Sequence, residues 1–411
     1  MKRPVHYALI GATGIGGMHL DALRAMENRG EIKLVAVADP ALSHSTKLRT
    51  ALAGQGIQTY LDYHEMLRRQ EDIEVVAISA PIPLHLPMTL ACLERDVFVY
   101  LEKPPVPVIQ HLRTLIAADR NQRVGVGFQM ICTSWVREAK RAIMEGRLGR
   151  LRSIRISACW PRLDNYYGRN ASAGRLAVNG EPVFDGPATN ALAHLIHNAM
   201  YFAGPHQDGF DIPTEVQAEL YRARPIESYD VACLRAKLSS GVIVTAALTH
   251  ATEKLQPYRM EIRGSDGWMR ITENDTAWAT SFPLPATPME AFEDGLARGH
   301  HQFLEYARGE CAHPATSLED TRGYLLATNG MLLSSQKIHS ITPSHLRKYT
   351  VKAVHGYDVA GLYDAVDQSF CTGQLFSELG LPWAVKTDLV SVENLESLNL
   401  TPKTIEQGSA V

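Results

Sequence analysis

A glycine-rich stretch near the start of the chain constrains the fold more than any other feature. An apolar run over residues 5–10 leads into residues 11–19, GATGIGGMH, and an apolar pattern with helical spacing follows. This order predicts a buried strand, a tight turn and a helix whose first N–H groups can bind a phosphate. A second apolar run over residues 32–38 ends in Asp39, roughly twenty residues beyond the glycines, where a carboxylate can bind a ribose. Together these features predict a dinucleotide-binding unit.

The glycine spacing fits two patterns. Gly11, Gly14 and Gly16 approximate G-x-G-x-x-G, with Thr13 at the position of the second glycine, whereas Gly17 completes the G-x-x-G-x-x-G pattern of short-chain dehydrogenases. Those enzymes deprotonate their substrate with a Tyr-x-x-x-Lys pair, and no tyrosine of this chain has a lysine four residues later. The chemistry therefore favours the first pattern. A simple surface turn, the remaining alternative, does not explain the strand, the helix and Asp39.

Composition limits the class of protein. A chain of 411 residues exceeds one comfortable hydrophobic core, which predicts at least two domains. A net charge of -3 without a basic run argues against a nucleic-acid partner. Six scattered cysteines without a C-x-x-C pair signal neither a disulfide framework nor a metal site. The first strand leaves no room for a signal peptide and no apolar run has transmembrane length, so we expect a cytoplasmic protein that does not bind membranes.

Strands alternate with helices over residues 1–124, which predicts a parallel, doubly wound α/β sheet. The strand over residues 75–79 ends at Ala80, and the strand over residues 97–101 ends at Glu102 and Lys103. Because parallel strands bind ligands at their carboxyl ends, we expect these residues to lie near Asp39.

Residues 125–345 have another pattern, in which strand-like runs are separated by turn signals. They predict an α+β domain with a large, mostly antiparallel open sheet, one face of which is free to pack against another subunit. Residues 346–411 form a C-terminal extension with one helical pattern, packed on the domains. Its polar tail, from about residue 399, is expected to be poorly ordered.

Residues 11–19, Asp39, Glu102-Lys103-Pro104 and Asn190-x-x-x-His194 occur in the order found in one family. In these motifs the chain resembles the glucose-fructose oxidoreductase, inositol dehydrogenase and rhizopine-catabolism (Gfo/Idh/MocA) family, over about residues 4–340. The resemblance implies an N-terminal Rossmann domain that binds a nicotinamide dinucleotide, and a homodimer or homotetramer formed through the C-terminal sheet. It also implies reversible hydride transfer between the cofactor and a secondary alcohol of a sugar, cyclitol or related polyol. The implied cofactor-binding residues are Gly11, Thr13, Gly14, Ile15, Gly16, Asp39, Ala80, His85 and Glu102.

Lys103 is the first candidate for catalysis. An ammonium at a strand end beside the nicotinamide can bind the reacting hydroxyl, stabilise alkoxide character and relay a proton. The family often has a cis bond before this proline, so we predict a cis Lys103–Pro104 bond. Glu102 is expected to fix the local geometry or to touch the cofactor. The alternative is an ordinary lysine that faces solvent.

His194 is the second candidate. We expect one helix over residues 189–202, in which Asn190, His194 and His197 lie on nearly one face. Family members have a carboxylate one turn before the histidine, which serves as general base. Here that position is Asn190, whose amide cannot take a proton, and Asp185 in the preceding loop is the candidate for the missing charge. The alternatives are a buried core histidine and half of a metal site.

The loop over residues 160–184 is the candidate substrate-binding segment. Trp160 and Tyr167 offer faces for stacking on a sugar, and Arg169 offers donors to hydroxyls. The alternative is a surface loop packed by its own aromatic residues.

The sequence therefore predicts a dehydrogenase of a sugar, glycoside or inositol-like alcohol. Asp39 favours NAD, since it would repel the 2′-phosphate of NADP, although Lys47 and Arg49 keep NADP as an alternative. Two other hypotheses stay open. One is glycoside cleavage by transient oxidation and elimination, and the other is a cofactor-binding sensor without turnover.

Overall fold

The computed structural model describes residues 3–273, 275, 277–284 and 291–400. The chain divides into two compact units. The first comprises Met1–Val106, His111–Thr133 and Glu290–Thr321, and the second comprises Pro107–Gln110, Ser134–Met289 and Arg322–Val411. We predicted domains of residues 1–124 and 125–345, and the main difference is that residues 290–321 return to the first unit. Most of the predicted polar tail lies outside the described residues.

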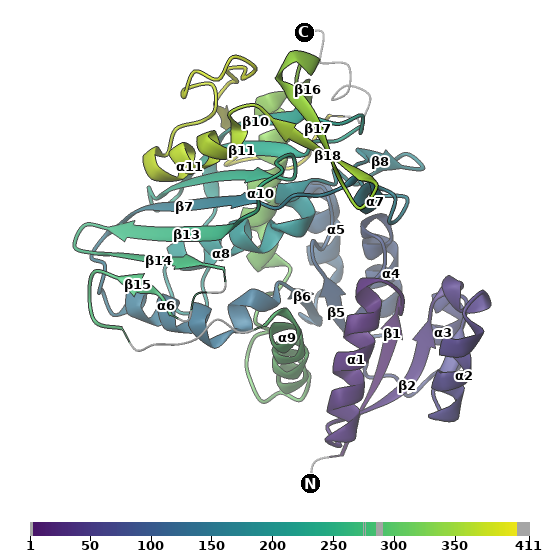
Figure 1. The fold of residues 1–411 in the computed structure, drawn as a ribbon. Coiled ribbons are helices and arrows are strands. Elements are labelled where there is room, and N and C mark those ends of the chain that lie inside the picture. The colour runs from purple at the N-terminus through teal and green to yellow at the C-terminus, as the bar shows by residue number, and fades with distance from the viewer. Residues whose placement is uncertain (1–2, 274, 276, 285–290, 401–411) are drawn as a thin grey trace. The chain divides into compact units, whose positions relative to one another are not determined.

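The first unit contains a six-stranded sheet in the order β3-β2-β1-β4-β5-β6 (Figure 1). Every pairing is parallel, so the predicted doubly wound Rossmann sheet is confirmed. Its elements are β1 (Val5–Ile10), α1 (Ile15–Asn28), β2 (Ile32–Ala38), α2 (Thr46–Gly54), β3 (Gln58–Tyr60), α3 (Tyr63–Arg69), β4 (Val75–Ile78), α4 (His85–Leu93), β5 (Phe98–Glu102), α5 (Ile109–Ala118) and β6 (Val124–Gly127).

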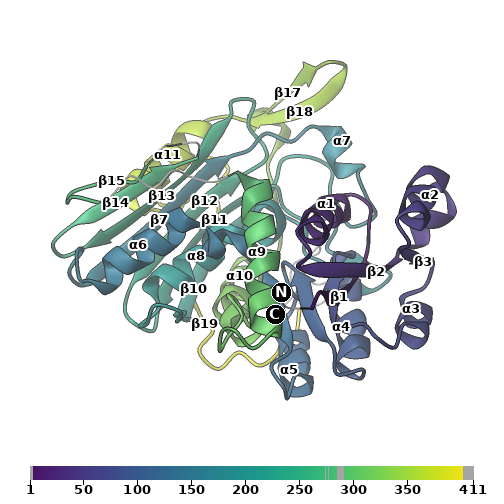
Figure 2. The same ribbon diagram turned by 90° about the horizontal axis from the view of Figure 1, so that it is seen from below.

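Helix α9 (Phe292–Ala307) completes this unit from a distant part of the chain. It lies beside α1 in both views (Figures 1 and 2). Phe303 and Leu304 of α9 join the same buried core as Leu20 and Leu23 of α1. A Cβ on Gly125 would lie 2.5 Å from the ring of Phe303, so this strand glycine makes room for the helix.

The second unit contains a nine-stranded sheet in the order β15-β14-β13-β7-β12-β11-β10-β16, with β19 beside β10. Most pairings are antiparallel, as predicted, and β7–β12 and β10–β16 are parallel. The strands are β7 (Leu151–Cys159), β10 (Pro213–Arg222), β11 (Val231–Leu238), β12 (Ile243–Thr249), β13 (Gln256–Gly264), β14 (Trp268–Thr272), β15 (Ala279–Thr280), β16 (His339–Ser340) and β19 (Val390–Ser391). Helices α6 (Ser134–Met144), α8 (Ala193–Ala203) and α10 (Arg322–Ser335) lie on one side of this sheet (Figure 2).

The other face of the sheet, which we expected to be free, is covered by the chain itself. The C-terminal extension folds into a hairpin of β17 (Leu346–Val351) and β18 (Val354–Val359), followed by α11 (Leu362–Thr372). Leu362, Val366 and Phe376 pack in one buried cluster with sheet residues Val231 and Cys233. The expectation of an open face is therefore wrong for the part of the sheet that these residues cover.

Two short elements, β8 (Ala177–Val178) and β9 (Glu181–Pro182), form a separate hairpin, and α7 (Asp164–Tyr167) precedes it. Among the described residues, each helix is too short or too polar to cross a membrane.

Candidate active site

The turn after β1 and the first turn of α1 each contain a glycine that has no room for a side chain. Gly11 has a φ of +84°, and a Cβ there would lie 2.5 Å from the carbonyl oxygen of Ser79. A Cβ on Gly16 would lie 2.3 Å from the carbonyl oxygen of Gly11. Both distances are far inside van der Waals contact with backbone, so any larger residue would displace the loop. The loop thus holds the start of α1 close to the ends of β1 and β4.

Gly14 is different, because its surroundings are open. Its φ is +60°, and no atom lies within 4 Å of the position that a Cβ would take. Gly14 directly precedes α1, with Thr13 and the exposed side chain of Ile15 on either side. Open space at a glycine next to a helix N-terminus is the geometry that admits a pyrophosphate. The loop therefore fits the dinucleotide that the glycine pattern predicts.

Asp39 fastens this loop to the end of β2. Its Oδ2 accepts hydrogen bonds from Ala12 N at 2.8 Å and Thr13 Oγ1 at 3.1 Å, and its Oδ1 accepts one from Ala41 N at 2.8 Å. Each carboxylate oxygen has two lone pairs, so Asp39 can still accept from a ribose hydroxyl. Asp39 is thus both a support of the glycine loop and a candidate ribose ligand.

Lys103 and Glu102 lie where β5 ends. The Lys103–Pro104 bond is cis, as predicted. Only 12% of the Lys103 side chain is exposed, and its Nζ lies 4.0 Å from Oε1 of Glu102. The alternative of an ordinary lysine that faces solvent is therefore contradicted.

Glu102 is buried and lies 3.2 Å, through Oε2, from Nε2 of His19. Burial alone would raise the pKa of its carboxyl, but the hydrogen bond to His19 and the charge of Lys103 outweigh it and lower the pKa. A buried carboxylate therefore stays ionised beside the Lys103 ammonium.

His85 joins the ends of β4 and β5. Its Nδ1 lies 2.9 Å from the carbonyl oxygen of Pro104, and its Nε2 lies 2.8 Å from the carbonyl oxygen of Ala80. Burial lowers the pKa of His85 below its usual value, although both carbonyls favour the protonated ring. The structure thus places Ala80 beside the Lys103–Pro104 loop, and His85 holds the two together.

In the second unit, the helix expected over residues 189–202 is interrupted. Pro187–Ala191 form a π-helical turn, Leu192 has φ −113° and ψ 16°, and α8 begins at Ala193. Asn190 and His194 therefore lie on different elements, and the predicted i, i+4 relation on one helix is wrong. Side-chain bonds of Thr189 accompany the break, since its hydroxyl donates to the nearby Phe184 carbonyl and makes a tertiary hydrogen bond with Tyr229 Oη at 3.0 Å.

Asp185 does reach Asn190. The Asn190 amide donates from Nδ2 to Asp185 Oδ1 at 2.6 Å, and Gly174 N donates to Oδ2 at 2.7 Å. Arg169 lies 3.4 Å from the same carboxylate. A negative charge is therefore present next to the amide that replaces the usual carboxylate.

His194 and His197 are both buried on α8. His197 stacks against Phe210 with ring centroids 4.9 Å apart, and burial lowers its pKa to about 3. His197 is therefore a neutral core histidine. No cluster of three or more His, Cys, Asp and Glu side chains suited to a metal occurs within the described part of the chain.

The aromatic side chains of the loop after β7 contact both the loop's own residues and residues outside it. The Trp160 indole donates to Glu273 Oε2 at 3.2 Å. The guanidinium of Arg169 lies 3.7 Å over the ring of Tyr166, and that of Arg224 lies 4.7 Å over the ring of Tyr167. One face of each tyrosine is therefore covered, whereas Arg169 links the loop to Asp185.

Arg224 was not singled out in the sequence. Its buried guanidinium pairs with Asp230 at 3.1 Å, donates to the Arg162 carbonyl at 2.7 Å and lies 5.0 Å over Tyr357 of β18. It thus connects the candidate substrate loop to the C-terminal extension. An arginine between two strands carries no sequence signal of burial, so only the structure identifies it.

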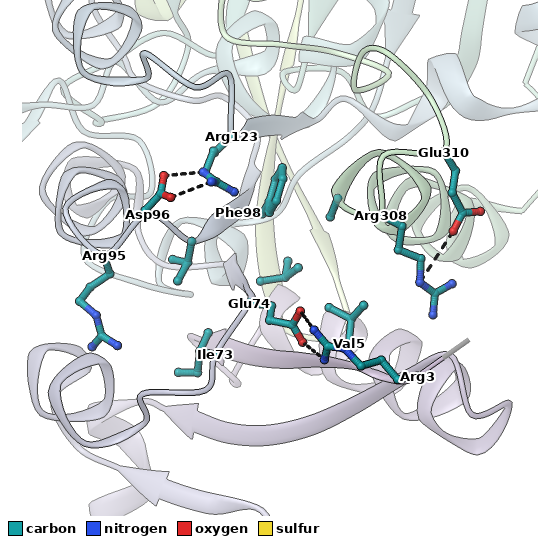
Figure 3. Close-up of a pocket in the computed structure, with 13 residues that line it drawn as sticks. Arg3, Val5, Ile73, Glu74, Arg95, Asp96, Phe98, Arg123, Arg308 and Glu310 are labelled. Carbon is teal, nitrogen blue, oxygen red and sulfur yellow. Dashed lines mark hydrogen bonds and ion pairs between the residues drawn. The ribbon is translucent and has the colours of Figure 1, made fainter. Parts of the chain in front are cut away.

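A cavity of about 510 Å³ lies at the amino ends of the first unit's strands, away from the carboxyl ends where the candidate site residues lie (Figure 3). It is lined by the first residues of β1, β4 and β5, whereas the glycine loop follows the carboxyl end of β1. Three of its four arginines are paired: Arg3 with Glu74 and Arg123 with Asp96, each at 2.6 Å, and Arg308 with Glu310 at 3.9 Å. This cavity is therefore not part of the candidate site.

Comparison with known families agrees with this geometry. Residues 5–128 match the model of an oxidoreductase family with an NAD-binding Rossmann fold, and residues 136–270 match the GFO/IDH/MocA C-terminal domain. Inositol 2-dehydrogenase 4 of Saccharopolyspora erythraea is 31% identical over 188 residues, which are 45% of this chain and 51% of that protein. The match thus spans about half the length of this relative.

Solved structures share the fold. The WlbA dehydrogenase from Bordetella pertussis, in complex with NADH and UDP-GlcNAcA, has a TM-score of 0.69 and 20% identity and covers 81% of this chain and 97% of its own. The myo-inositol 2-dehydrogenase from Lactobacillus plantarum has a TM-score of 0.64 and 23% identity, with the same coverage. About a fifth of this chain lies outside the part that these structures share. On the evidence of the two matching family models, the chain belongs to the Gfo/Idh/MocA family of NAD-binding oxidoreductases.

Proposed function

We propose that the protein is an NAD-dependent dehydrogenase that acts reversibly on a secondary hydroxyl of a sugar, glycoside or inositol-like polyol. The observation that carries this proposal is Lys103, a mostly buried ammonium next to the ionised Glu102 at the carboxyl end of β5. It lies in the same unit as the glycine loop and Asp39. The inositol dehydrogenase relatives support a polyol as the substrate class.

A nicotinamide held by the glycine loop and Asp39 would supply the hydride acceptor. Lys103 donates a hydrogen bond to the reacting hydroxyl and stabilises the negative charge that develops on its oxygen. His194 takes the hydroxyl proton as general base, and the Asn190–Asp185 pair orients a neighbouring hydroxyl through its amide and carboxylate oxygens. Trp160, Tyr167 and Arg169 belong to the loop that binds the rest of the substrate.

Asp39 sets the preference for NAD over NADP in this proposal. Its carboxylate accepts from ribose hydroxyls and repels a 2′-phosphate. Two hydrogen bonds from the glycine loop and one from Ala41 N hold it in place for this role. Affinities measured for both cofactors test the assignment, and tighter binding of NADP would contradict it.

The experiment is a screen of inositols, sugars and glycosides with NAD, followed by absorbance at 340 nm. We expect NADH to form with at least one polyol, and Lys103→Met to lose roughly 100-fold or more in kcat while it still binds NAD. Lys33→Met, at an exposed position of β2, is the matched control and should keep full activity.

Two outcomes would contradict the proposal. Full activity of Lys103→Met would exclude the lysine from the reaction. Release of the aglycone from a glycoside without accumulation of NADH would instead support cleavage by transient oxidation and elimination.

A further inference from the structure

Glu102 is the end of a buried row of hydrogen-bonding side chains in the first unit. Its Oε2 lies 3.2 Å from His19 Nε2, His19 Nδ1 lies 2.8 Å from His300 Nε2, and His300 Nδ1 lies 3.4 Å from Tyr7 Oη. His19, His300 and Tyr7 each have an exposed fraction of 0%. The row joins four elements, β5, α1, α9 and β1, whose residues are up to 293 positions apart.

Core packing alone does not account for this row. His19 lies on the buried face of α1 with Leu23, and His300 lies on the buried face of α9 with Leu304. An apolar residue at either position would avoid the cost of burying a polar ring. Buried polar networks are favourable only when every member is satisfied, and apolar replacements often stabilise as well or better. We therefore expect a function for the residue at one end of the row. The two ends are Tyr7 and Glu102, and Glu102 is the ionised one.

The possible proton positions favour an N–H directed at Glu102. Burial lowers the pKa of His300 well below its usual value, so its ring is neutral and has one N–H. Burial also raises the pKa of Tyr7, so its hydroxyl keeps its proton. When Tyr7 donates to His300, His300 donates to His19 and His19 donates to Glu102. When His300 instead donates to Tyr7, it accepts from His19 Nδ1–H, and a donor at His19 Nε2 toward Glu102 then requires a second proton on the His19 ring.

The third arrangement, in which a protonated Glu102 donates to His19, requires a neutral carboxyl, and the lowered pKa of Glu102 disfavours it. The titratable groups that face Glu102 are His19 from α1, Lys103 from the following loop, His85 from α4 and Tyr100 from β5 itself. Tyr100 also packs against His300, with ring centroids 4.3 Å apart. Of the groups that lower the pKa of Glu102, His19 has the largest effect.

We propose that His19 and His300 are positioning residues for Lys103: together they keep an N–H on Glu102, and the ionised Glu102 keeps the Lys103 ammonium charged and in place. The charge of Glu102 acts on Lys103 through the contact of 4.0 Å between Lys103 Nζ and Glu102 Oε1. The inference rests on the proposed function only in that Lys103 acts in the reaction. The state of Lys103 itself can be measured without turnover.

The test measures the apparent pKa of Lys103 in the full-length protein without cofactor, by competitive acetylation with acetic anhydride over a range of pH and mass spectrometry of the peptide. In His19→Leu, Glu102 loses its donor and burial favours its neutral form, so Lys103 loses its negative neighbour. We expect the pKa of Lys103 to fall by about one unit or more, the usual effect of an opposite charge at this distance. His300→Leu should shift it in the same direction by less, and His19→Gln, which retains a side-chain N–H, should restore most of the wild-type value.

Phe303→Leu is the matched control. Phe303 lies one turn from His300 on α9 and packs in the same core, but it has no polar atom in the row. This variant should unfold at a lower temperature without a change in the pKa of Lys103. An unchanged pKa in a folded His19→Leu protein, or an equal shift in Phe303→Leu, would overturn the proposal.

A second measurement separates this inference from the proposed function. With any substrate found in the screen, the limb of the pH profile of kcat that reports Lys103 should move to lower pH in His19→Leu, with a smaller change in KM. A pKa shift without turnover of any alcohol by the wild-type protein would refute the dehydrogenase assignment and leave the positioning role standing. Turnover with an unmoved pH profile would refute the positioning role alone.

Discussion

The structure predicts opposite effects for two adjacent glycines. In Gly16→Ala the new Cβ would lie 2.3 Å from the carbonyl oxygen of Gly11, whereas in Gly17→Ala the nearest atom, the carbonyl oxygen of Ala12, is 3.9 Å away. The first substitution tests the dinucleotide pattern, and the second tests the short-chain dehydrogenase pattern that the same glycines fit.

The cost of Gly16→Ala follows from this overlap. Ordinary contact begins near 3.4 Å, so the loop must move by about an ångström, and no flexible side chain can yield in its place. Overpacking of this kind costs about 1–3 kcal/mol. A loop that moves this far also strains the hydrogen bond of 2.8 Å from Ala12 N to Asp39. A loss of about 2 kcal/mol in NAD binding corresponds to a roughly thirtyfold weaker Kd.

Calorimetric titration with NAD and thermal unfolding measure both effects. We expect Gly16→Ala to bind NAD at least tenfold more weakly. Gly17→Ala should bind as the wild type does and gain up to about 1 kcal/mol of stability, because alanine favours the helix more than glycine. Equal affinities of Gly16→Ala and the wild type, or an equal loss in Gly17→Ala, would refute this account of the loop.

Three further predictions concern the second unit. Arg224→Met should lower the free energy of unfolding by about 3–5 kcal/mol, measured in urea, because it leaves the fully buried Asp230 without its partner; a loss under about 1 kcal/mol would show that the pair is not needed. Phe376→Ala should lower the free energy of unfolding by about 3–5 kcal/mol, since the ring is fully buried between the extension and the sheet, and size-exclusion chromatography should show association through the loosened face. Burial lowers the pKa of Lys140 to about 7, so the unfolded chain binds more protons between pH 7 and the usual lysine value, and the wild type should gain stability over Lys140→Met as pH rises from 7 to 9. A stability difference that is constant over this range would contradict the lowered pKa.

The first unit could be predicted well because its signals are local. A strand, a glycine turn and a helix follow one another within residues 5–28, and Asp39 and Lys103 each end a strand of the same parallel sheet. The rule that carboxyl ends of parallel strands meet at one edge then brings these residues into one unit without any long-range information.

Two predictions were wrong, the unbroken helix over residues 189–202 and the open face of the second sheet. Both involve contacts between segments distant in sequence. The break between Asn190 and His194 coincides with a hydrogen bond of Thr189 to Tyr229, forty residues later, and no helix propensity of the segment indicates that bond. The covered sheet face depends on a segment that follows the sheet's long central strands by about a hundred residues.

His19 shows how such a residue could be recognised. It stands in the quoted glycine stretch, on the apolar stripe of α1, where a polar residue implies a buried partner. The partner His300 is 281 residues away, and an apolar stripe on α9 does not indicate which helix it meets.

The return of α9 to the nucleotide-binding unit constrains how the chain is made. During synthesis the six strands of the sheet leave the ribosome well before residue 303, so the apolar surface beside Gly125 and Tyr100 that Phe303 covers stays exposed to water until α9 is made. The nucleotide-binding unit is therefore complete only after residues 290–321 have been made, and an excised fragment that stops after β6 would expose the same apolar surface permanently. Any excised version of this unit must include residues 290–321.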